Sequence, residues 1–354
     1  MKRISQLDGI RALAIAAVFL NHTYHFRLMW AGVDLFFTLS GFLITGILIH
    51  AKHLDIWAYF KHFYGRRVRR ILPPYLLFLA ATSIFFGVAW LRHWYMYAFL
   101  MNLLLVSSAQ RPEPFRVLWS LAVEEQFYLL WPFVVFFLRE RAIAATAILL
   151  MVAAPILRWT MTPLFHNYAA IYMLTPFRMD MLAAGAILAI IWRHKRSLVE
   201  RFGAFGPIAS ICAVAGLGFL GKFGVTTTSN TRFSNTVIYE LTLIASVGLV
   251  LWALSGRYVG ILRWPPIVYF GRISYSFYLI HTLPIIVLRS YLHNVGQIAV
   301  ASLVLTVLYS AASWHFFEKP LLYGKRGTRV RVEAEDDEKG VTEPLSVKAP
   351  TASA

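Results

Sequence analysis

An arginine and a histidine, Arg11 and His22, lie eleven residues apart in the first apolar segment of the sequence. At about 100° per residue, this spacing returns to within roughly 20° of the same helix face after a rise of roughly 16 Å. The cation could hold an anionic donor, and the imidazole could act as a general base or as a covalent relay. The spacing is equally compatible with a snorkelling arginine and a hydrogen-bonded core histidine.

A cluster of arginines precedes the proline pair at 73–74. Arg67 and Arg70 are three residues apart and would share a helix face, as would Arg66 and Arg69. Guanidinium forks suit phosphate oxygens such as those of coenzyme A. Because proline is favoured in a first helical turn, we expect the arginines to lie just before a helix that begins near residue 71. A topology anchor that binds lipid headgroups is the alternative.

Two adjacent carboxylates, Glu124 and Glu125, lie near the start of a later apolar segment. Neighbouring residues point about 100° apart on a helix, so we expect at most one of them to face the core. A carboxylate facing His22 could fix its tautomer, as in catalytic triads. Alternatively, both acids lie at headgroup level and stabilise the start of the helix.

Further ionisable residues lie inside apolar segments, where they are costly and are usually functional or paired. Asp34, Arg178, Asp180 and His281 are therefore candidates for substrate contact or for a structural polar core, and Glu240 and Arg272 belong to the same group. His25 is roughly 40° off the face of Arg11, so we expect no role for it.

The elements that must position these residues are membrane helices. A span needs about 20 apolar residues, and ten segments qualify: 10–28, 33–50, 71–91, 118–138, 142–159, 171–192, 205–223, 236–254, 267–288 and 296–317. The run 94–106 is too short and is expected to be interfacial or re-entrant. The predicted fold is an all-α integral membrane bundle of about ten transmembrane helices.

The composition agrees with this fold, since 58% of the residues are hydrophobic and only 14% are charged. Of the 34 Lys and Arg residues, 24 fall on one predicted side and 8 on the other. Basic loops stay inside, which places both termini in the cytoplasm. The net charge of +17 is thus a topology signal rather than a sign of nucleic-acid binding. A single cysteine, Cys212, excludes an intramolecular disulfide and a CxxC metal site.

The C-terminal region 321–354 changes character to an acidic run followed by Pro, Ser, Thr and Ala. Such a segment cannot build a core, and we expect a disordered cytoplasmic tail after a membrane domain at 1–320. The basic N-terminus with its apolar run resembles a signal peptide, but it has no small-residue cleavage site. We interpret it as a retained first helix.

Six blocks, taken in order, resemble acyltransferase family 3, whose members are membrane proteins that acylate sugars and related acceptors. The family hallmarks are an Arg-x10-His pair in the first helix and an Arg-x-x-Arg before the third. The blocks are LDGIRAL at 7–13 with His22 following, GVDLFFTLSGFLI at 32–44, WSLAVEEQFY at 119–128, FRMD at 177–180 with Gly185 following, ISYSFYLIH at 273–281 and FEKP at 317–320.

The resemblance implies that His22 is the catalytic histidine and that Arg11 supports either the donor or the histidine. It implies that Arg67 and Arg70 bind the donor, with Arg66 and Arg69 as an overlapping pair. Glu124 is the implied functional acid, and we expect it to orient the imidazole. Asp34, Arg178, Asp180 and His281 receive no specific role.

The implied reaction transfers an acyl group, acetyl above all, from cytoplasmic acyl-CoA to a hydroxyl of a carbohydrate-type acceptor at the outer side of the membrane. No metal and no bound cofactor are implied, because acyl-CoA is a substrate. A separate extracytoplasmic partner is a further expectation, since some family members carry a fused esterase-like domain. The protein would reside in the cell (inner) membrane as a multi-pass protein. The alternative is a transporter or flippase of glycans or lipid-linked sugars, which often contains an internal repeat; none is visible in the sequence.

Overall fold

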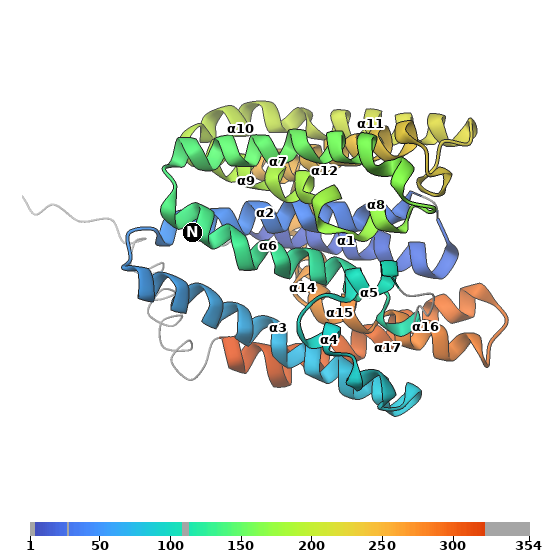
Figure 1. Cartoon of the computed structure of the whole chain (residues 1–354). Coiled ribbons are helices and arrows are strands. Elements are labelled where there is room, and N and C mark those ends of the chain that lie inside the picture. The colour runs from blue at the N-terminus through green and yellow to red at the C-terminus, as the bar shows by residue number, and fades with distance from the viewer. Residues whose placement is uncertain (1–3, 27, 108–112, 323–354) are drawn as a thin grey trace, which may run out of the picture.

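The computed structural model describes residues 4–26, 28–107 and 113–322, and these residues form helices and turns without a β-strand among them. The prediction of an all-α fold is therefore confirmed for this part of the chain. The long helices run along a common axis, and the start of α1 and the end of α17 lie toward the same end of the bundle (Figure 1). These helices are α1 (Ser5–Tyr24), α2 (Gly32–Ala51), α3 (Ile56–Phe86), α6 (Leu118–Phe137), α7 (Glu140–Met161), α9 (Met179–His194), α11 (Gly206–Lys222), α12 (Arg232–Ser255) and α17 (Val295–Ser313).

Shorter helices complete the bundle. They are α4 (Trp94–Tyr97), α5 (Met101–Ser107), α8 (Ala169–Met173), α10 (Arg196–Phe202), α13 (Gly260–Arg263), α14 (Pro265–Arg272), α15 (Ser274–Ile280) and α16 (Thr282–Arg289). Neither α4 nor α5 is long enough to cross a bilayer, which needs about 20 residues. Leu321 and Leu322 continue the last helix, and the rest of the predicted tail, 323–354, lies outside the described residues.

Seven helical segments in the described part of the chain are long and apolar enough to cross a membrane, and α14 with α15–α16, bent by 56°, adds an eighth if the bent pair is one span. Helices α1 and α9 are not among them, and α9 has only 16 residues. Ten spans thus remain a prediction, although every predicted segment contains a helix. Large apolar side chains cover the outward faces of α7 and α11, as lipid contact requires: Ile148, Leu149, Val152, Ile156, Ile208, Ile211 and Phe219. The chain is a multi-pass membrane protein.

Helix α3 differs most from its predicted form. It begins at Ile56, where Asp55 accepts a hydrogen bond from the Ala58 amide at 3.0 Å, and the proline pair lies inside it. The prediction that the helix begins at these prolines was wrong. Proline usually breaks a helix, but here tertiary packing prevails: the Tyr59 and Tyr64 hydroxyls bond to carbonyl oxygens of α6 at 3.2 and 2.9 Å.

Two further predicted spans are interrupted. The segment 171–192 is divided into α8, a 3₁₀ turn at Thr175–Phe177 and α9. Pro176 cannot donate the hydrogen bond of a continuing helix, and the break brings Arg178 to the start of α9. The segment 267–288 bends between α14 and α15. Neither interruption could be inferred from hydropathy, which records length and not continuity.

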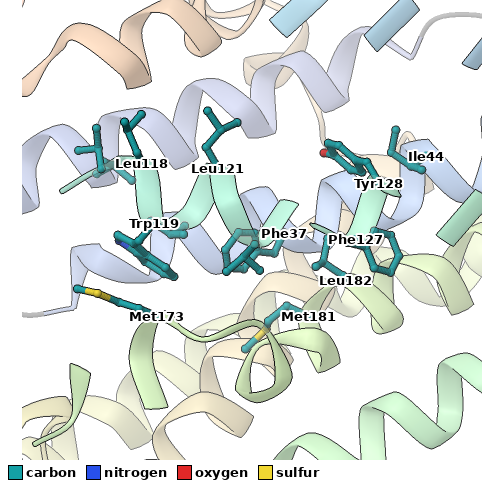
Figure 2. Close-up of a cluster of buried hydrophobic side chains, with 14 of the residues drawn as sticks. Phe37, Ile44, Leu118, Trp119, Leu121, Phe127, Tyr128, Met173, Met181 and Leu182 are labelled. Atoms are coloured by element: carbon teal, nitrogen blue, oxygen red, sulfur yellow. The ribbon is translucent and has the colours of Figure 1, made fainter. Parts of the chain in front are cut away.

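Helix α2 lies at the centre of the bundle and packs against α1, α6, α9 and α12. Helix α6 presents a row of large side chains to it, and Figure 2 shows Leu118, Trp119, Leu121, Phe127 and Tyr128 of α6 with Phe37 and Ile44 of α2 and Met181 and Leu182 of α9. Helix α2 itself carries apolar side chains around most of its circumference, as expected for a helix that is buried on all sides.

Helices α2 and α9 approach most closely at two glycines, where a Cβ on Gly41 would lie 1.9 Å from the Leu182 carbonyl oxygen and one on Gly185 would lie 2.1 Å from that of Thr38. We expect Gly41→Ala or Gly185→Ala to force the backbones apart and to lower the free energy of unfolding by about 3 kcal/mol. Thermal unfolding in detergent measures the loss. Gly218→Ala is the matched control, because no atom lies within 4 Å of the added methyl group. Equal stability of the three variants would contradict this packing.

Candidate functional site

Two cavities lie on either side of a thin wall in the bundle. The arginine cavity, of about 90 Å³, is lined by the side chains of Arg11, Ser40, Arg67, Arg70, Glu124, Glu125 and Tyr128, among others. The histidine cavity, of about 830 Å³, is lined by His22, His25, Trp30, Trp119, Tyr168, Tyr172, Lys222 and Arg289, among others. Helix α1 contributes to both, with Arg11 in the first cavity and His22 in the second. The helix face that Arg11 and His22 were predicted to share therefore lines one cavity at Arg11 and the other at His22.

Only one of the two overlapping arginine pairs lines the arginine cavity. Arg67 and Arg70 line it, whereas Arg66 and Arg69 are exposed on the other face of α3. The Arg67 guanidinium lies over the Tyr128 ring, 4.6 Å from its centre. Because the arginines lie within α3, and not in a preceding loop, they project from a rigid element.

Arg11 completes the cluster of cations from the opposite side. Its Nη1 donates to Asp8 one turn earlier at 2.8 Å, and Asp8 is buried. This ion pair fixes the direction of the guanidinium while its other nitrogens stay available to the cavity. Three arginines from two helices thus surround one small space, which is an arrangement suited to phosphate or another anion.

Glu124 and Glu125 both line the arginine cavity, so the prediction that at most one would face the core was wrong. Both side chains are half-buried, so two neighbouring directions around α6 face this cavity. Glu124 accepts a hydrogen bond from the Ser40 hydroxyl at 2.5 Å. Glu125 Oε1 is buried without a hydrogen-bond partner among the described residues. Both acids lie with the arginines and apart from His22.

The hydrogen bonds of His22 define its protonation. Its Nδ1 lies 3.0 Å from the Val18 carbonyl oxygen, and a carbonyl only accepts, so Nδ1 carries the proton. Nε2, on the opposite side of the neutral ring, is then the unprotonated nitrogen. Among the described residues it has no hydrogen-bond partner. The ring lines the histidine cavity and can serve there as base or nucleophile.

The group beside His22 is His281, whose Nε2 lies 3.2 Å from His22 Nδ1. The expectation that Glu124 orients the imidazole was therefore wrong: Glu124 is bonded to Ser40 in the other cavity. His281 sits between α15 and α16 and is fully buried. From the end of α16, Arg289 also donates to the His22 carbonyl oxygen at 2.9 Å, so this segment holds the end of α1 twice.

The wall between the cavities is formed by Val33 and Tyr278, which line both. The Tyr278 hydroxyl donates to the Val117 carbonyl oxygen at 3.1 Å and lies 2.5 Å from the Ser120 hydroxyl. A side chain on α15 is thus fastened to the start of α6. A reactive group that moves from the arginines to His22 must pass these two residues.

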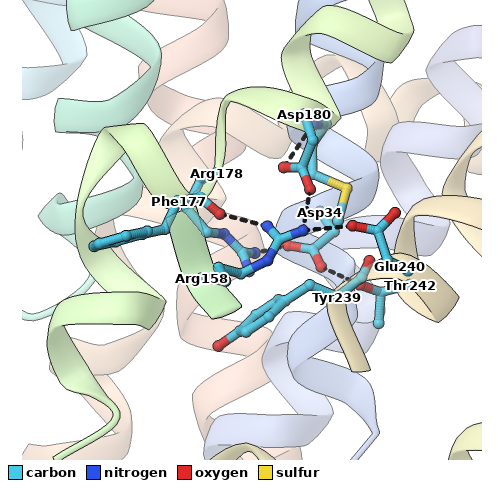
Figure 3. A network of polar contacts seen from close by, with 9 residues as sticks. Asp34, Arg158, Phe177, Arg178, Asp180, Tyr239, Glu240 and Thr242 are labelled. Atoms are coloured by element: carbon cyan, nitrogen blue, oxygen red, sulfur yellow. Dashed lines mark hydrogen bonds and ion pairs between the residues drawn. The ribbon is translucent and has the colours of Figure 1, made fainter. Parts of the chain in front are cut away.

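Figure 3 shows an ionic network that includes Arg178. This arginine packs against two aromatic side chains that also line the histidine cavity, Trp119 and Tyr172. Arg178 forms an ion pair with Asp34, whose other oxygen accepts from Thr242 at 2.7 Å. The Arg178 guanidinium is enclosed by aromatic rings, with the Tyr239 ring centre at 4.5 Å. The candidates Asp34 and Arg178, on α2 and before α9, are thus partners, which suits a structural role in joining these helices.

Arg158 is the centre of the second half of the network, and sequence reasoning missed it. It is one of the eight Lys and Arg residues counted on the predicted outer side, whereas it is fully buried and donates to Asp180, Glu240 and the Phe177 carbonyl oxygen, each at 2.6 Å. The available signal was its position inside the apolar pattern of α7, beside Pro155. Asp180 is thereby assigned to a structural pair.

Within the described ranges, no group of three or more His, Cys, Asp and Glu side chains is placed to hold a metal ion. The chemistry that the geometry offers is an unprotonated imidazole in one chamber and an anion-binding cluster of arginines in the next. Helical spans around such chambers define a polytopic membrane protein whose site suits group transfer. The chain belongs to acyltransferase family 3: the family model, an acyltransferase domain, matches residues 4–315.

Individual relatives agree with this assignment. YrhL of Bacillus subtilis is 29% identical in an alignment of 362 positions that covers 90% of this chain and 55% of that protein. The peptidoglycan O-acetyltransferase OatA of Listeria monocytogenes is 28% identical in an alignment of 366 positions that covers 90% of this chain and 56% of that protein. The O-acetyltransferase OatA of Staphylococcus aureus is 28% identical over 354 residues, with 89% and 56% covered. The chain spans about half the length of these relatives. No solved structure matches it.

Proposed function

We propose that this protein is a membrane O-acyltransferase that moves an acetyl group from a donor bound at the arginine cavity to a hydroxyl of a carbohydrate acceptor in the histidine cavity. The observation that supports this proposal is the placement of His22 with an unprotonated Nε2 in a chamber next to three converging arginines. Membership in acyltransferase family 3 and similarity to O-acetyltransferases support the reaction class.

The proposed donor is acetyl-CoA, which enters from the cytoplasm. A cavity of about 90 Å³ is too small for the whole molecule. The anionic part would therefore remain at the mouth of the cavity on Arg67 and Arg70, with the thioester arm directed inward toward Tyr278. The guanidinium of Arg11, which bonds to Asp8 through Nη1, lines the same space, and its other nitrogens would stabilise negative charge that develops on the thioester oxygen.

At His22, two routes satisfy the chemistry. In one, Nε2 removes the proton of the acceptor hydroxyl while its oxygen attacks the thioester carbonyl; the carbon–sulfur bond breaks, and the thiolate leaves and is protonated. In the other, Nε2 attacks the thioester carbonyl, the carbon–sulfur bond breaks and the thiolate leaves. The acceptor oxygen then attacks the acetyl carbon, the carbon–nitrogen bond breaks to restore the neutral imidazole, and the hydroxyl proton passes to water, from which the thiolate is protonated. Both routes use the same nitrogen and leave Nδ1–H in place.

The proposed acceptor is a glycan or glycoside, and the Listeria relative is a peptidoglycan O-acetyltransferase. The histidine cavity suits this class because its aromatic walls can pack against sugar rings while Asn21 and Thr226–Thr228 offer hydrogen bonds. At about 830 Å³ it is large enough for a disaccharide-sized group.

We place the protein in the cell (inner) membrane, with both termini and the arginine cavity on the cytoplasmic side and the histidine cavity on the outer side. The positive charge of the predicted inner loops supports this orientation. The acceptor would be presented in the histidine cavity directly or through a separate extracytoplasmic partner. The membrane domain would extend over residues 1–320.

Acetyl-CoA binding to purified protein, measured by calorimetry, tests the donor assignment. We expect Arg67→Ala/Arg70→Ala to weaken binding by about a hundredfold or more, because two charge-assisted contacts are lost. The matched control is Arg66→Ala/Arg69→Ala, which removes the same charge from the exposed face of the same helix and should change the affinity by less than about threefold. If both double variants lose affinity equally, the arginines act only through net charge. If the wild type does not bind acetyl-CoA, the donor is a different molecule.

A further inference from the structure

His281 makes the contact that sequence reasoning assigned to Glu124. Its Nδ1 lies 2.7 Å from the carbonyl oxygen of Tyr278, three residues earlier, and a carbonyl only accepts, so Nδ1 carries the proton. In a neutral imidazole, Nε2 is then an acceptor. That nitrogen faces His22 Nδ1 at 3.2 Å, and His22 Nδ1 carries a proton for the same reason. Donor and acceptor match without any change of tautomer.

Burial separates the roles of the two rings. His22 lines the histidine cavity, whereas His281 is fully buried and lines neither cavity. It is enclosed by the Phe277 ring, which stacks on it with centres 6.3 Å apart, and by its own turn of helix. His281 therefore cannot touch a substrate, but its position is rigid.

We propose that His281 is the positioning residue of the catalytic histidine. It accepts the Nδ1 proton of His22 together with the Val18 carbonyl, limits rotation of the ring and keeps Nε2 unprotonated and directed into the histidine cavity. When Nε2 takes the acceptor proton, the ring becomes a cation, and the hydrogen bond from Nδ1 to His281 becomes stronger. His281 thus supplies the acceptor that an aspartate supplies in other catalytic triads, without a buried negative charge.

This inference rests on the proposed function and adds a residue to it. A neutral acceptor is consistent with the surroundings, because a buried carboxylate with no cation to pair it would be costly there. The contact is also sensitive to geometry. With both acceptors, the His22 ring is fixed relative to α1 and to the segment that carries His281. With the Val18 carbonyl alone, the ring would be fixed only relative to its own helix, and any movement of α1 would move Nε2.

The test compares three substitutions of His281 that differ in where they place an acceptor. His281→Gln reaches the position of Nε2 with an amide oxygen. His281→Met has similar size and reach but no comparable acceptor. His281→Asn can keep the hydrogen bond to Tyr278 but is too short to reach His22. Acetyl transfer to a glycan acceptor is measured in reconstituted membranes with acetyl-CoA, alongside acetyl-CoA affinity and the thermal midpoint of each variant.

We expect kcat to fall by about 10- to 100-fold in the Met and Asn variants, since orientation is part of a general base's effect. The Gln variant should keep most of the wild-type rate of acetyl transfer. In all three variants, the acetyl-CoA affinity and the KM for the glycan acceptor should stay within about threefold of the wild-type values. Equal rates in the Gln and Met variants, or a wild-type rate in the Asn variant, would overturn the inference. Unfolding of the Met variant leaves the Gln and Asn comparison decisive. His22→Asn, measured in parallel, separates the cases: if it retains transfer, the proposed function itself fails, and if it alone loses transfer, only the role of His281 fails.

Discussion

His22→Asn should lose acetyl transfer by about a thousandfold while it binds acetyl-CoA with unchanged affinity. The rate falls because the substitution removes Nε2, the proposed base or acyl carrier, and such groups contribute about 10²- to 10⁴-fold. The affinity stays because His22 lies in the histidine cavity and makes no contact with Arg67 or Arg70. The measurement pairs the transfer rate in reconstituted membranes with calorimetric binding of acetyl-CoA.

His25→Asn is the matched control for this prediction. His25 lines the same cavity and ends α1 with φ of 57°, a left-handed conformation that asparagine tolerates well. Its ring lies 3.4 Å from Arg289, at the margin of hydrogen bonding. We expect this variant to keep its rate within about threefold. A similar loss in both variants would mean that the cavity needs imidazoles for binding, and that His22 is not distinguished chemically.

Arg158→Met should destabilise the protein by about 3–5 kcal/mol, because it leaves Asp180 and Glu240 without their cation. Arg158 and Asp180 have no exposed side-chain surface, so water cannot replace the lost contact. We also expect Arg158→Lys to restore only part of the stability, since an ammonium group cannot bond to two carboxylates and the Phe177 carbonyl with the same fork geometry. Thermal unfolding in detergent measures both effects.

Arg141→Met provides the control, because Arg141 lies on the same helix with an exposed side chain and should cost less than about 0.5 kcal/mol. Neutralising the acids in the same chain, as Arg158→Met/Asp180→Asn/Glu240→Gln, should recover part of the loss. If the triple variant is less stable than Arg158→Met alone, the carboxylates are held by contacts other than this arginine.

Periodicity and hydropathy were sufficient to place a helix in every predicted segment and to select candidate side chains. Arg11 and His22 became candidates because a charge or an imidazole in an apolar segment is rare and costly, and Arg67 because it shares a helix face with Arg70 in a basic cluster. Their division between two cavities could not be inferred, since it depends on how α1, α3 and α6 pack. For the same reason the pairing of His22 with His281, 259 residues apart, had no local signal.

The wrong start of α3 and the treatment of Arg158 as an outer cation also result from tertiary contacts that the sequence does not show. The prolines of α3 suggested a helix start, but the helix is held before them by the bond from Tyr59 to α6 and after them by the bond from Tyr75 to the Met96 carbonyl oxygen. Arg158 was counted among the cations of the outer side because its position near a helix end resembles that of a topology signal. Only its partners on α9 and α12 show that it is a core residue.

The wall formed by Val33 and Tyr278 also has an electrical consequence. If water fills both chambers, most of the membrane potential falls across this thin layer, where each elementary charge that crosses gains or loses about 2.3 kcal/mol per 100 mV. In the proposed reaction, the anionic carrier of the acetyl group would stay with the arginines. The transfer would leave a thiolate on the donor side of the wall and the proton of the acceptor hydroxyl on the other side, so each turnover would separate one elementary charge unless that proton returned to the thiolate through the wall. With proton return, the rate of acetyl transfer would not depend on the membrane potential; without it, an inside-negative potential would oppose each turnover.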